Sequence, residues 1–259
     1  RLGVETSFIG KIGNCESGNF YKDSLAQQGG NTQSFKMGSI PNGKCLSLVT
    51  PDGERTMRTS LGAAMTLSED DLKPSDFKGY DHLHIEGFLI LNKNVLLKAL
   101  NLAKANNLTV SFDLASFEIV NQSRDELIEI LKHHVDMVFA NEDEAAAFTQ
   151  LPPSQSEKSA QVLNELCEMA VVKLGAKGSL IAKDNTIIHS EAIPVKDVID
   201  TTGAGDFWAA GFLHGWANNQ SIQDSAKFGA LMGASVIQNH GGTLSQSQWD
   251  AILKSIQTI

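Results

Sequence analysis

The chain has 259 residues, of which 42% are hydrophobic and 20% are charged. This composition is typical of one large globular domain and argues against extended disorder. The formal net charge at pH 7 is −9, and this argues against a nucleic-acid partner, because proteins that bind nucleic acids normally carry a basic face. A small anionic substrate is still compatible with this charge, because a local pocket can oppose the global field.

Three cysteines, Cys15, Cys45 and Cys167, are far apart in the chain and form no CxxC pair. Their odd number and their spacing argue against a disulfide framework or a zinc site and fit a reducing compartment, so we expect a cytoplasmic protein. No apolar run approaches the ~20 residues of a membrane span, and no signal peptide is visible. We therefore expect no membrane partner.

The first sixty residues contain two β-type runs, Cys45–Val49 and Thr56–Thr59, on either side of a Pro-Asp-Gly turn signal at 51–53. This pattern predicts a hairpin in a small sheet, which we interpret as a β lid from about Gln33 to Ser60. From about Asp81 on, short apolar runs alternate with amphipathic helical stretches. Strands are predicted at 83–85, 108–112, 135–140, 169–173 and 179–182, and helices at 94–106, 124–132, 142–148, 205–216 and 223–238.

Alternating strands and helices predict an α/β fold with a mostly parallel sheet wrapped by helices on both faces. Ligands of such sheets bind at the carboxyl ends of the strands. The residues directly after the predicted strands are therefore candidates for a site, and nearly all of them are polar or glycine. They are Glu86, Asp113, Asn141, the segment 173–178 and the segment 200–206.

The segment 200–206 reads Asp-Thr-Thr-Gly-Ala-Gly-Asp and leads into an apolar helical run. Gly203 and Gly205 allow a tight turn, and the unpaired N–H groups of a helix start favour a phosphate or a developing oxyanion. We expect this field to hold Asp206 ionised, so that it can accept a proton from an attacking hydroxyl. The alternative is a glycine-rich turn in which Asp206 only caps the helix. The Walker motif GxxxxGK[ST] is absent, and Trp208 stands where a Rossmann fingerprint requires Gly or Ala.

The other candidates also have structural interpretations. The pattern Asn141-x-x-Glu144 is that of a helix capping box, and the capping and functional roles can hold together. Glu86 and Asp113 could be strand-end caps, and Lys173 could mark a plain strand exit. The seven histidines show no ligand spacing with cysteines or carboxylates, so no metal cluster is predicted.

Several segments together resemble one family. The stretch 200–206 resembles the signature of the ribokinase-like, or phosphofructokinase B, family of sugar and nucleoside kinases. Further matches occur in order at 8–13 (an early strand), 52–56 (the lid hairpin), 140–145 (the Asn-x-x-Glu motif), 172–178 (the nucleotide strand and turn) and 239–242 (the nucleotide and cation loop). The resemblance runs from residue 1 to about 257. It implies a single ribokinase-like kinase domain over 1–259, with a mostly parallel sheet sandwiched by helices and a small β lid.

The resemblance implies roles for the residues that match, and ATP, Mg²⁺ and K⁺ as ligands. The implied catalytic residues are the base Asp206 and the anion hole Gly203, Ala204 and Gly205. The residues implied to bind ATP and Mg²⁺ are Asn141, Glu144, Lys173, Gly175, Gly178 and Gly229. Those implied to bind the substrate are Glu86, Asp113 and Asp206. Those implied to hold a monovalent cation are Asp200, Thr202, Val236, Asn239, Gly241 and Ser245.

The implied reaction is transfer of the ATP γ-phosphoryl group to a hydroxyl of a sugar. Two alternatives stay open: an adenosine-type nucleoside kinase, which the run 110–117 resembles, and a non-catalytic nucleotide-binding regulatory protein. The family also implies a homodimer through the β lid. Its first strand, with a substrate-binding Asp, and the Gly-Gly and Asn that hold substrate hydroxyls have no counterpart from Arg1 onward. We therefore expect a segment to precede Arg1, and the particular substrate cannot be inferred.

Overall fold

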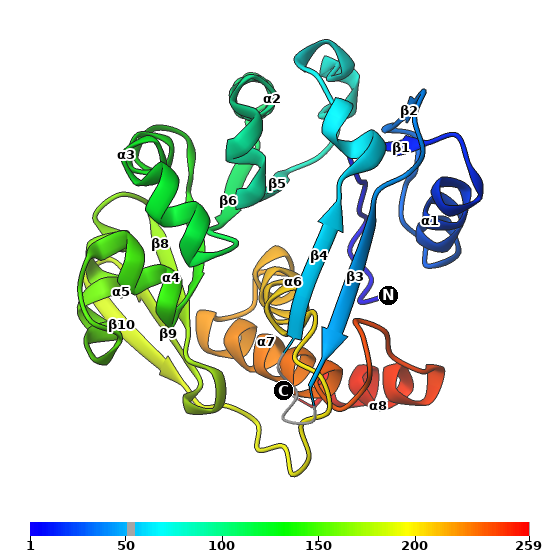
Figure 1. The fold of residues 1–259 in the computed structure, drawn as a ribbon. Coiled ribbons are helices and arrows are strands. Elements are labelled where there is room, and N and C mark those ends of the chain that lie inside the picture. The colour runs from blue at the N-terminus through cyan, green and yellow to red at the C-terminus, as the bar shows by residue number, and fades with distance from the viewer. Residues whose placement is uncertain (51–54, 259) are drawn as a thin grey trace.

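The computed structural model describes residues 1–50 and 55–258. Its centre is a six-stranded sheet in the order β10-β9-β8-β7-β6-β5 (Figure 1). Neighbours from β5 to β8 are parallel, and β9 and β10 are antiparallel additions at one edge. The strands are β5 (His82–Glu86), β6 (Thr109–Asp113), β7 (Met137–Asn141), β8 (Met169–Lys173), β9 (Ser179–Lys183) and β10 (Thr186–Ser190). The mostly parallel α/β sheet predicted from the alternation is confirmed.

Helices cover both faces of this sheet (Figure 1). One face carries α2 (Lys93–Ala105), α3 (Phe117–His134), α4 (Glu142–Thr149) and α5 (Ser156–Asn164), and the other carries α6 (Ala204–Ala217) and α7 (Ile222–Val236). Strand β7 shows why both faces are covered. Val138 and Ala140 point into the first apolar cluster, Met137 and Phe139 point into the second, and all four are buried. Such near-continuous apolar strands are typical of parallel sheets that are buried on both sides.

The N-terminal part forms separate small sheets. Strands β1 (Gly10–Gly13) and β2 (Phe35–Gly38) pair in parallel, with α1 (Glu16–Gln27) between them in the chain. Strands β3 (Lys44–Val49) and β4 (Arg55–Ser60) form an antiparallel hairpin, as the two β-type runs predicted. The predicted turn at 51–53 lies outside the described residues.

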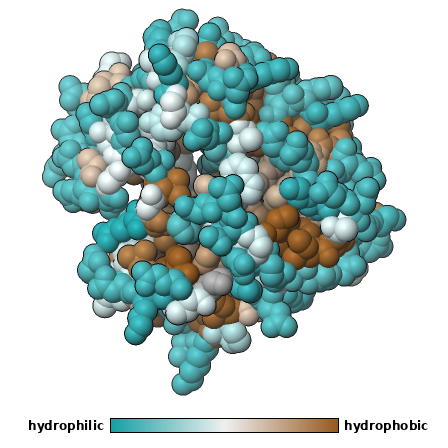
Figure 2. All heavy atoms as spheres, turned by 180° about the vertical axis from the view of Figure 1, so that it is seen from behind, coloured by the Kyte–Doolittle hydropathy of each residue, from teal (hydrophilic) through white to brown (hydrophobic). Residues whose placement is uncertain are grey.

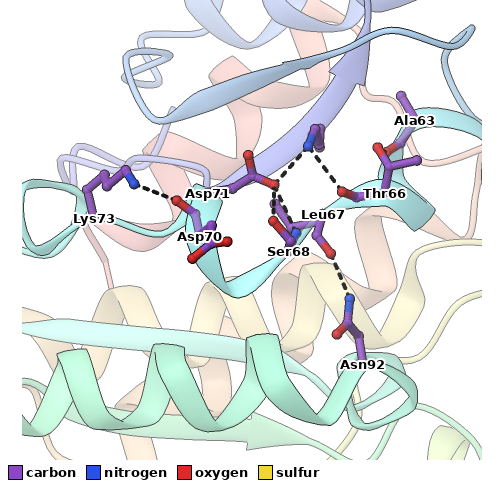
Figure 3. A network of polar contacts seen from close by, with 9 residues as sticks. Ala63, Thr66, Leu67, Ser68, Asp70, Asp71, Lys73 and Asn92 are labelled. Carbon is purple, nitrogen blue, oxygen red and sulfur yellow. Dashed lines mark hydrogen bonds and ion pairs between the residues drawn. The ribbon is translucent and has the colours of Figure 1, made fainter.

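A polar network fixes β1 to the segment that leads into the main sheet (Figure 3). The Lys11 ammonium group on β1 donates to Asp71 Oδ2 at 2.8 Å and to the Thr66 carbonyl at 3.1 Å. Asn92, directly before α2, donates from Nδ2 to the Leu67 carbonyl at 2.8 Å. These contacts hold the small parallel sheet against the start of the main α/β unit.

The last helix, α8 (Gln246–Ile256), packs on α7. Trp249 and Ile252 of α8 are buried together with Met232 of α7 in a third apolar cluster. On the face of the molecule shown in Figure 2, hydrophilic side chains cover most of the surface and apolar side chains gather in separate patches.

Candidate active site

The polar residues predicted at the strand ends lie in one row along the carboxyl edge of the sheet. Glu86 at the end of β5 pairs in register with Asp113 at the end of β6, and Asn141 of β7 pairs with Lys173 of β8. Asp206, in the first turn of α6, interacts electrostatically with Glu86, Asp113 and Lys173. The structure therefore brings together residues from five elements that are up to 120 positions apart in the chain.

Among the described residues, Lys173 is the only cation in this row. Its ammonium group contacts Asp113 on one side and the glycine turn on the other. Its Nζ atom lies 2.8 Å from Asp113 Oδ2, and only 13% and 12% of the two side chains are exposed. A Cβ atom built on Gly205 would lie 3.3 Å from the same Nζ atom, so the ammonium group also borders the glycine turn. Burial alone would lower the pKa of Lys173, but Asp113, Glu144 and Asp206 outweigh it and the pKa is raised. The Lys173 ammonium group therefore stays charged beside the glycine turn.

The glycine turn lies at the start of α6, where the anion hole is predicted, and this role stays a prediction. Gly203 is the N-cap of α6 and has φ +78°, a conformation that favours glycine. The Ala204 N–H donates to the Thr201 carbonyl at 3.1 Å, so the turn itself uses this donor. Within the residues that the structure describes, we find no acceptor for the N–H groups of Gly203, Gly205 and Asp206. Of the three residues predicted for the hole, only Ala204 has its N–H bonded within the turn, and Asp206 adds a further donor.

Asp206 is exposed at the start of α6. Its pKa is raised above the ordinary value, because neighbouring atoms remove water from one side of the carboxyl group and because Glu86 and Asp113 add like charge; Lys173 only partly offsets this. Desolvation and acidic neighbours therefore oppose the effect expected of the helix start, and the ionised state of Asp206 stays a prediction. An accessible carboxylate with a raised pKa is suited to accept a proton.

Asn141 and Glu144 form a complete capping box at the start of α4. Asn141 Oδ1 accepts from the N–H groups of Asp143 and Glu144, at 2.9 and 2.8 Å. The Glu144 carboxylate accepts in return from the N–H and Nδ2 groups of Asn141, both at 2.8 Å. Only 4% of Glu144 is exposed, and burial, followed by the charge of Asp113, raises its pKa to about 7. The capping interpretation is confirmed, while the role toward Mg²⁺ stays a prediction.

Of the residues predicted for a monovalent cation, Thr202 and Gly241 contact the Asp200 carboxylate. Asp200 Oδ1 accepts from the N–H and Oγ1 groups of Thr202, at 2.8 and 2.7 Å, and Oδ2 accepts from the Gly241 N–H at 2.8 Å. The carboxylate thereby joins the glycine turn to the loop after α7. Asn239 bonds to the end of α7 and to Gln248, while Ser245 is the N-cap of α8 and Val236 is buried at the end of α7.

Three predicted glycines lie apart from the row. Gly175 is exposed with φ +56°, and Gly178 is buried with φ +92° against the Ser190 carbonyl of β10. Gly229 lies in the interface between α6 and α7, where an added Cβ atom would come within 2.8 Å of the Trp208 ring. Its backbone is buried in this interface, so the structure does not bring Gly229 to the polar edge.

Two contacts were not anticipated from the sequence. The ion pair between Lys173 and Asp113 joins residues 60 positions apart, so no local motif predicts it. His84 Nε2 lies 3.7 Å from Glu86 Oε1. A signal for this contact was present, because the alternating residues His82, His84 and Glu86 must share one face of a strand.

Among residues 1–50 and 55–258, no group of three or more His, Cys, Asp or Glu side chains has the arrangement of a metal site. In the same part of the chain, no helix combines the length and the apolar character needed to cross a membrane.

Curated relatives match along nearly the whole chain. An uncharacterised sugar kinase of Archaeoglobus fulgidus is 26% identical over 245 residues, which cover 93% of this chain and 94% of the relative. Adenosine kinase 2 of Arabidopsis thaliana is 27% identical over 255 residues, which cover 92% of this chain and 73% of the relative. This chain is thus similar to both sugar and nucleoside kinases.

Solved structures share its fold. A probable sugar kinase from Rhizobium etli superposes with a TM-score of 0.92 at 29% identity and covers 98% of this chain and 78% of its own. An adenosine kinase from Sinorhizobium meliloti gives 0.91 at 28% identity, covering 98% and 79%. A putative ribokinase II from E. coli, in complex with ATP and Mg²⁺, gives 0.85 at 24% identity, covering 98% and 84%.

The model of the pfkB family of carbohydrate kinases matches residues 1–249. This match confirms the resemblance drawn from the segment 200–206, and it covers the whole row of strand-end residues. The chain therefore belongs to the pfkB carbohydrate kinase family, whose members are phosphotransferases with an alcohol group as acceptor.

Proposed function

We propose that the chain transfers the γ-phosphoryl group of ATP to a primary hydroxyl of a sugar, with Asp206 as the catalytic base. The observation that carries this proposal is the position of Asp206. Its accessible carboxyl group stands at the glycine turn of α6, beside Glu86, Asp113 and the charged Lys173. Phosphoryl transfer requires a group that accepts the proton of the attacking hydroxyl, and N–H donors and a cation that stabilise the developing negative charge.

The residues of the site divide this work. Asp206 orients the acceptor hydroxyl and takes its proton, since a carboxylate with a raised pKa binds that proton more firmly. The N–H groups of Gly205 and Asp206 and the Lys173 ammonium group face the charge that develops on the transferred phosphoryl oxygens. Glu86, at the exposed end of β5, is the proposed contact for another hydroxyl of the substrate.

The row carries an excess of negative charge that a bound cation would offset. Three of its carboxyl groups, those of Asp113, Glu144 and Asp206, act on the single ammonium group of Lys173. We assign Asn141 and Glu144 to the ordering of Mg²⁺, its waters and the triphosphate. When bound, Mg²⁺ would supply charge neutralisation for the phosphoryl group. The nucleotide would pass along the turn from Lys173 to Gly178, and the resemblance would place Gly229 near the adenine.

A nucleoside acceptor is the second candidate. It is favoured by the adenosine kinases among the relatives, at 27% and 28% identity. A non-catalytic nucleotide-binding protein is disfavoured, because the base, the glycine turn and the lysine are all present and adjacent.

An acceptor screen tests the proposal and separates the two candidates. ADP release is measured with ATP and Mg²⁺ in the presence of ribose, fructose, fructose phosphate or adenosine, with no acceptor as the control. Stimulation by a sugar supports the proposal, and stimulation by adenosine alone supports the nucleoside kinase. If no alcohol raises ADP release above the control, the proposed function is wrong.

We also propose that a monovalent cation such as K⁺ binds at the loop around Asp200. The Asp200 carboxylate already ties Thr202 to Gly241, and carbonyl groups near Val236, Asn239 and Ser245 could add oxygen ligands. A cage with one carboxylate and several carbonyls suits a large, weakly hydrated ion better than Mg²⁺. Its effect would be to fix the backbone of the glycine turn.

A homodimer through the β lid and a cytoplasmic location are also proposed. Both faces of the β3–β4 hairpin are exposed, and Leu46, Leu48 and Met57 are 60%, 55% and 41% exposed. Exposed apolar side chains of this kind are typical of interaction surfaces. The cysteines Cys15, Cys45 and Cys167 are all free, which fits a reducing compartment.

A further inference from the structure

Strands β5 and β6 carry a polar ladder on the face that lies against α6. His82 pairs in register with Thr109, and His84 pairs with Ser111. The ladder lies among aromatic residues, since the His82 ring is 4.9 Å from the Trp216 ring and the His84 ring is 5.9 Å from the Phe139 ring. β5 is the edge strand and the two histidines are half-buried, but Ser111 on β6 is fully buried. Such positions in a parallel sheet are normally apolar, so the Ser111 hydroxyl needs partners.

The ladder is a continuous chain of contacts that ends at the site. His82 Nδ1 lies 2.8 Å from Thr109 Oγ1, and His82 Nε2 lies 2.7 Å from Ser111 Oγ. On its other side, Ser111 Oγ lies 2.7 Å from His84 Nδ1. His84 Nε2 then faces Glu86 Oε1 at 3.7 Å. The chain thus connects the amino end of β6 with the residue proposed to bind the substrate.

Proton counting limits how this chain can be arranged. The Ser111 hydroxyl has one proton, so it donates to one histidine and accepts from the other. Burial, together with the nearby His84, lowers the pKa of His82 to about 4, so at neutral pH His82 is neutral and has one N–H. The chain therefore points as a whole either toward Glu86 or toward Thr109. In the second case, His82 donates to the Thr109 hydroxyl, which donates to the Asp81 carbonyl at 3.1 Å. In the first case, the Thr109 hydroxyl donates to His82 Nδ1 instead, and the Asp81 carbonyl still accepts from the Thr109 N–H at 3.0 Å.

The Glu86 end decides the direction. If a neutral His84 had its proton on Nδ1, the bare Nε2 lone pair would face the Glu86 carboxylate. If the proton is on Nε2, the chain ends in an N–H that faces the carboxylate across 3.7 Å, an attractive electrostatic contact that is longer than a hydrogen bond. A doubly protonated His84 also presents an N–H at Nε2. Every favourable arrangement therefore places a proton on Nε2.

We infer that His84 is a positioning residue for Glu86: its Nε2–H, fixed in place through Ser111 and His82, holds Glu86 Oε1 and leaves Oε2 for a substrate hydroxyl. Glu86 needs such a partner, because 55% of its side chain is exposed and the carboxyl groups of Asp206 and Glu144 interact with it unfavourably. The charged groups that face His84 are Glu86 on its own strand and Asp206 on α6. The inference rests on the proposed role of Glu86 in binding the acceptor.

Nitrogen-15 NMR of histidine in the wild-type chain tests the inference without any assay of activity. The ring-nitrogen shifts of His82 and His84 are assigned with the variants His82→Asn and His84→Asn and followed as the pH is raised. The neutral forms of both residues should carry their proton on Nε2. A neutral His84 with its proton on Nδ1 means that the chain points away from Glu86, and this overturns the inference.

Two substitutions at position 84 provide a matched kinetic test. The amide nitrogen of Gln reaches about as far as His Nε2, whereas that of Asn reaches only about as far as Nδ1. With the best acceptor among ribose, fructose, fructose phosphate and adenosine, His84→Asn should raise the acceptor KM roughly two- to fivefold, the range for one partly exposed charge contact. The same variant should leave kcat nearly unchanged, and His84→Gln should retain the wild-type KM.

A double-variant comparison separates this inference from the proposed function. In a Glu86→Gln background, His84→Asn should have little further effect, because the two side chains act together. An acceptor KM that rises in Glu86→Gln but is the same in wild type and His84→Asn overturns the inference and leaves the role of Glu86 intact. An acceptor KM unchanged in Glu86→Gln contradicts the proposed role of Glu86 itself, and the inference fails with it.

Discussion

Replacing Glu144 by Gln should change the pH dependence of stability. Glu144 is buried at the start of α4, and its pKa is raised from 4.5 to about 7. The folded protein binds the proton of the Glu144 carboxyl group more tightly than the unfolded chain does. At low pH the group is protonated in both states, so it does not lower the free energy of unfolding. Stability is then lost as the pH rises from about 4.5 through about 7. The amide that the substitution introduces does not ionise and avoids this loss.

The magnitude follows from the difference between the two pKa values. A shift of this size corresponds to about 3 kcal/mol once the group is fully ionised, of which some 2 to 3 kcal/mol should develop between pH 5 and pH 8. Against this gain, Gln can accept from the Asn141 N–H but cannot accept from Asn141 Nδ2, and the lost hydrogen bond costs about 1 kcal/mol at any pH. The variant should therefore be about as stable as wild type at pH 5 and about 2 kcal/mol more stable at pH 8.

Urea unfolding at a series of pH values measures this difference. Asp143→Asn, an exposed change in the same helical turn, serves as the matched control and should alter stability by no more than about 0.5 kcal/mol. If the difference between Glu144→Gln and wild type is the same at pH 5 and pH 8, the buried carboxyl group does not titrate as described. The same variant tests the proposed role toward Mg²⁺, because it should raise the Mg²⁺ concentration for half-maximal rate. No shift in that titration leaves only the capping role.

Three further predictions concern other parts of the site and the lid. Lys173→Met leaves the mostly buried Asp113 carboxylate without its partner, so the free energy of unfolding should fall by about 3 kcal/mol and kcat should fall strongly. Thermal or urea unfolding measures the first effect, and a variant as stable as wild type contradicts the importance of the ion pair. Activity of the wild type should be higher in K⁺ than in tetramethylammonium at equal ionic strength, and Asp200→Asn should remove the difference. Equal wild-type rates in the two salts remove the cation from the mechanism. Leu46→Lys, on the exposed hairpin, should shift the chain from dimer to monomer in light scattering, and an unchanged mass contradicts the lid interface.

The row of site residues could be predicted because it depends on local order. In a parallel sheet, strand ends share one edge, so Glu86, Asp113, Asn141 and Lys173 had to lie together once their strands were identified. Their pairing was not predictable in the same way. The ion pair between Asp113 and Lys173 depends on how far each side chain reaches across β7, and the pKa of Glu144 depends on burial, which appears only after packing.

The missed elements differ in whether the sequence contained a signal. Strand β10 follows Asp184 and Asn185, which both have positive φ, and such a pair is a hairpin turn signal. Helix α8 opens with a capping box of Ser245 and Gln248, again a readable pattern. Helix α5 (Ser156–Asn164) has mostly polar residues and gains its stability from contacts with β8 and β9, so its periodicity was too weak to identify.

The most direct test of the central claim compares wild type with Asp206→Asn in acceptor-dependent ADP formation. The substitution keeps the shape of the side chain and removes the base. The account predicts that kcat falls by roughly 10²–10⁴, the range for a lost general base, while ATP binding is nearly retained. A variant that keeps more than about a third of the wild-type kcat would contradict the assignment of Asp206 as the catalytic base, since loss of a general base costs at least ~10².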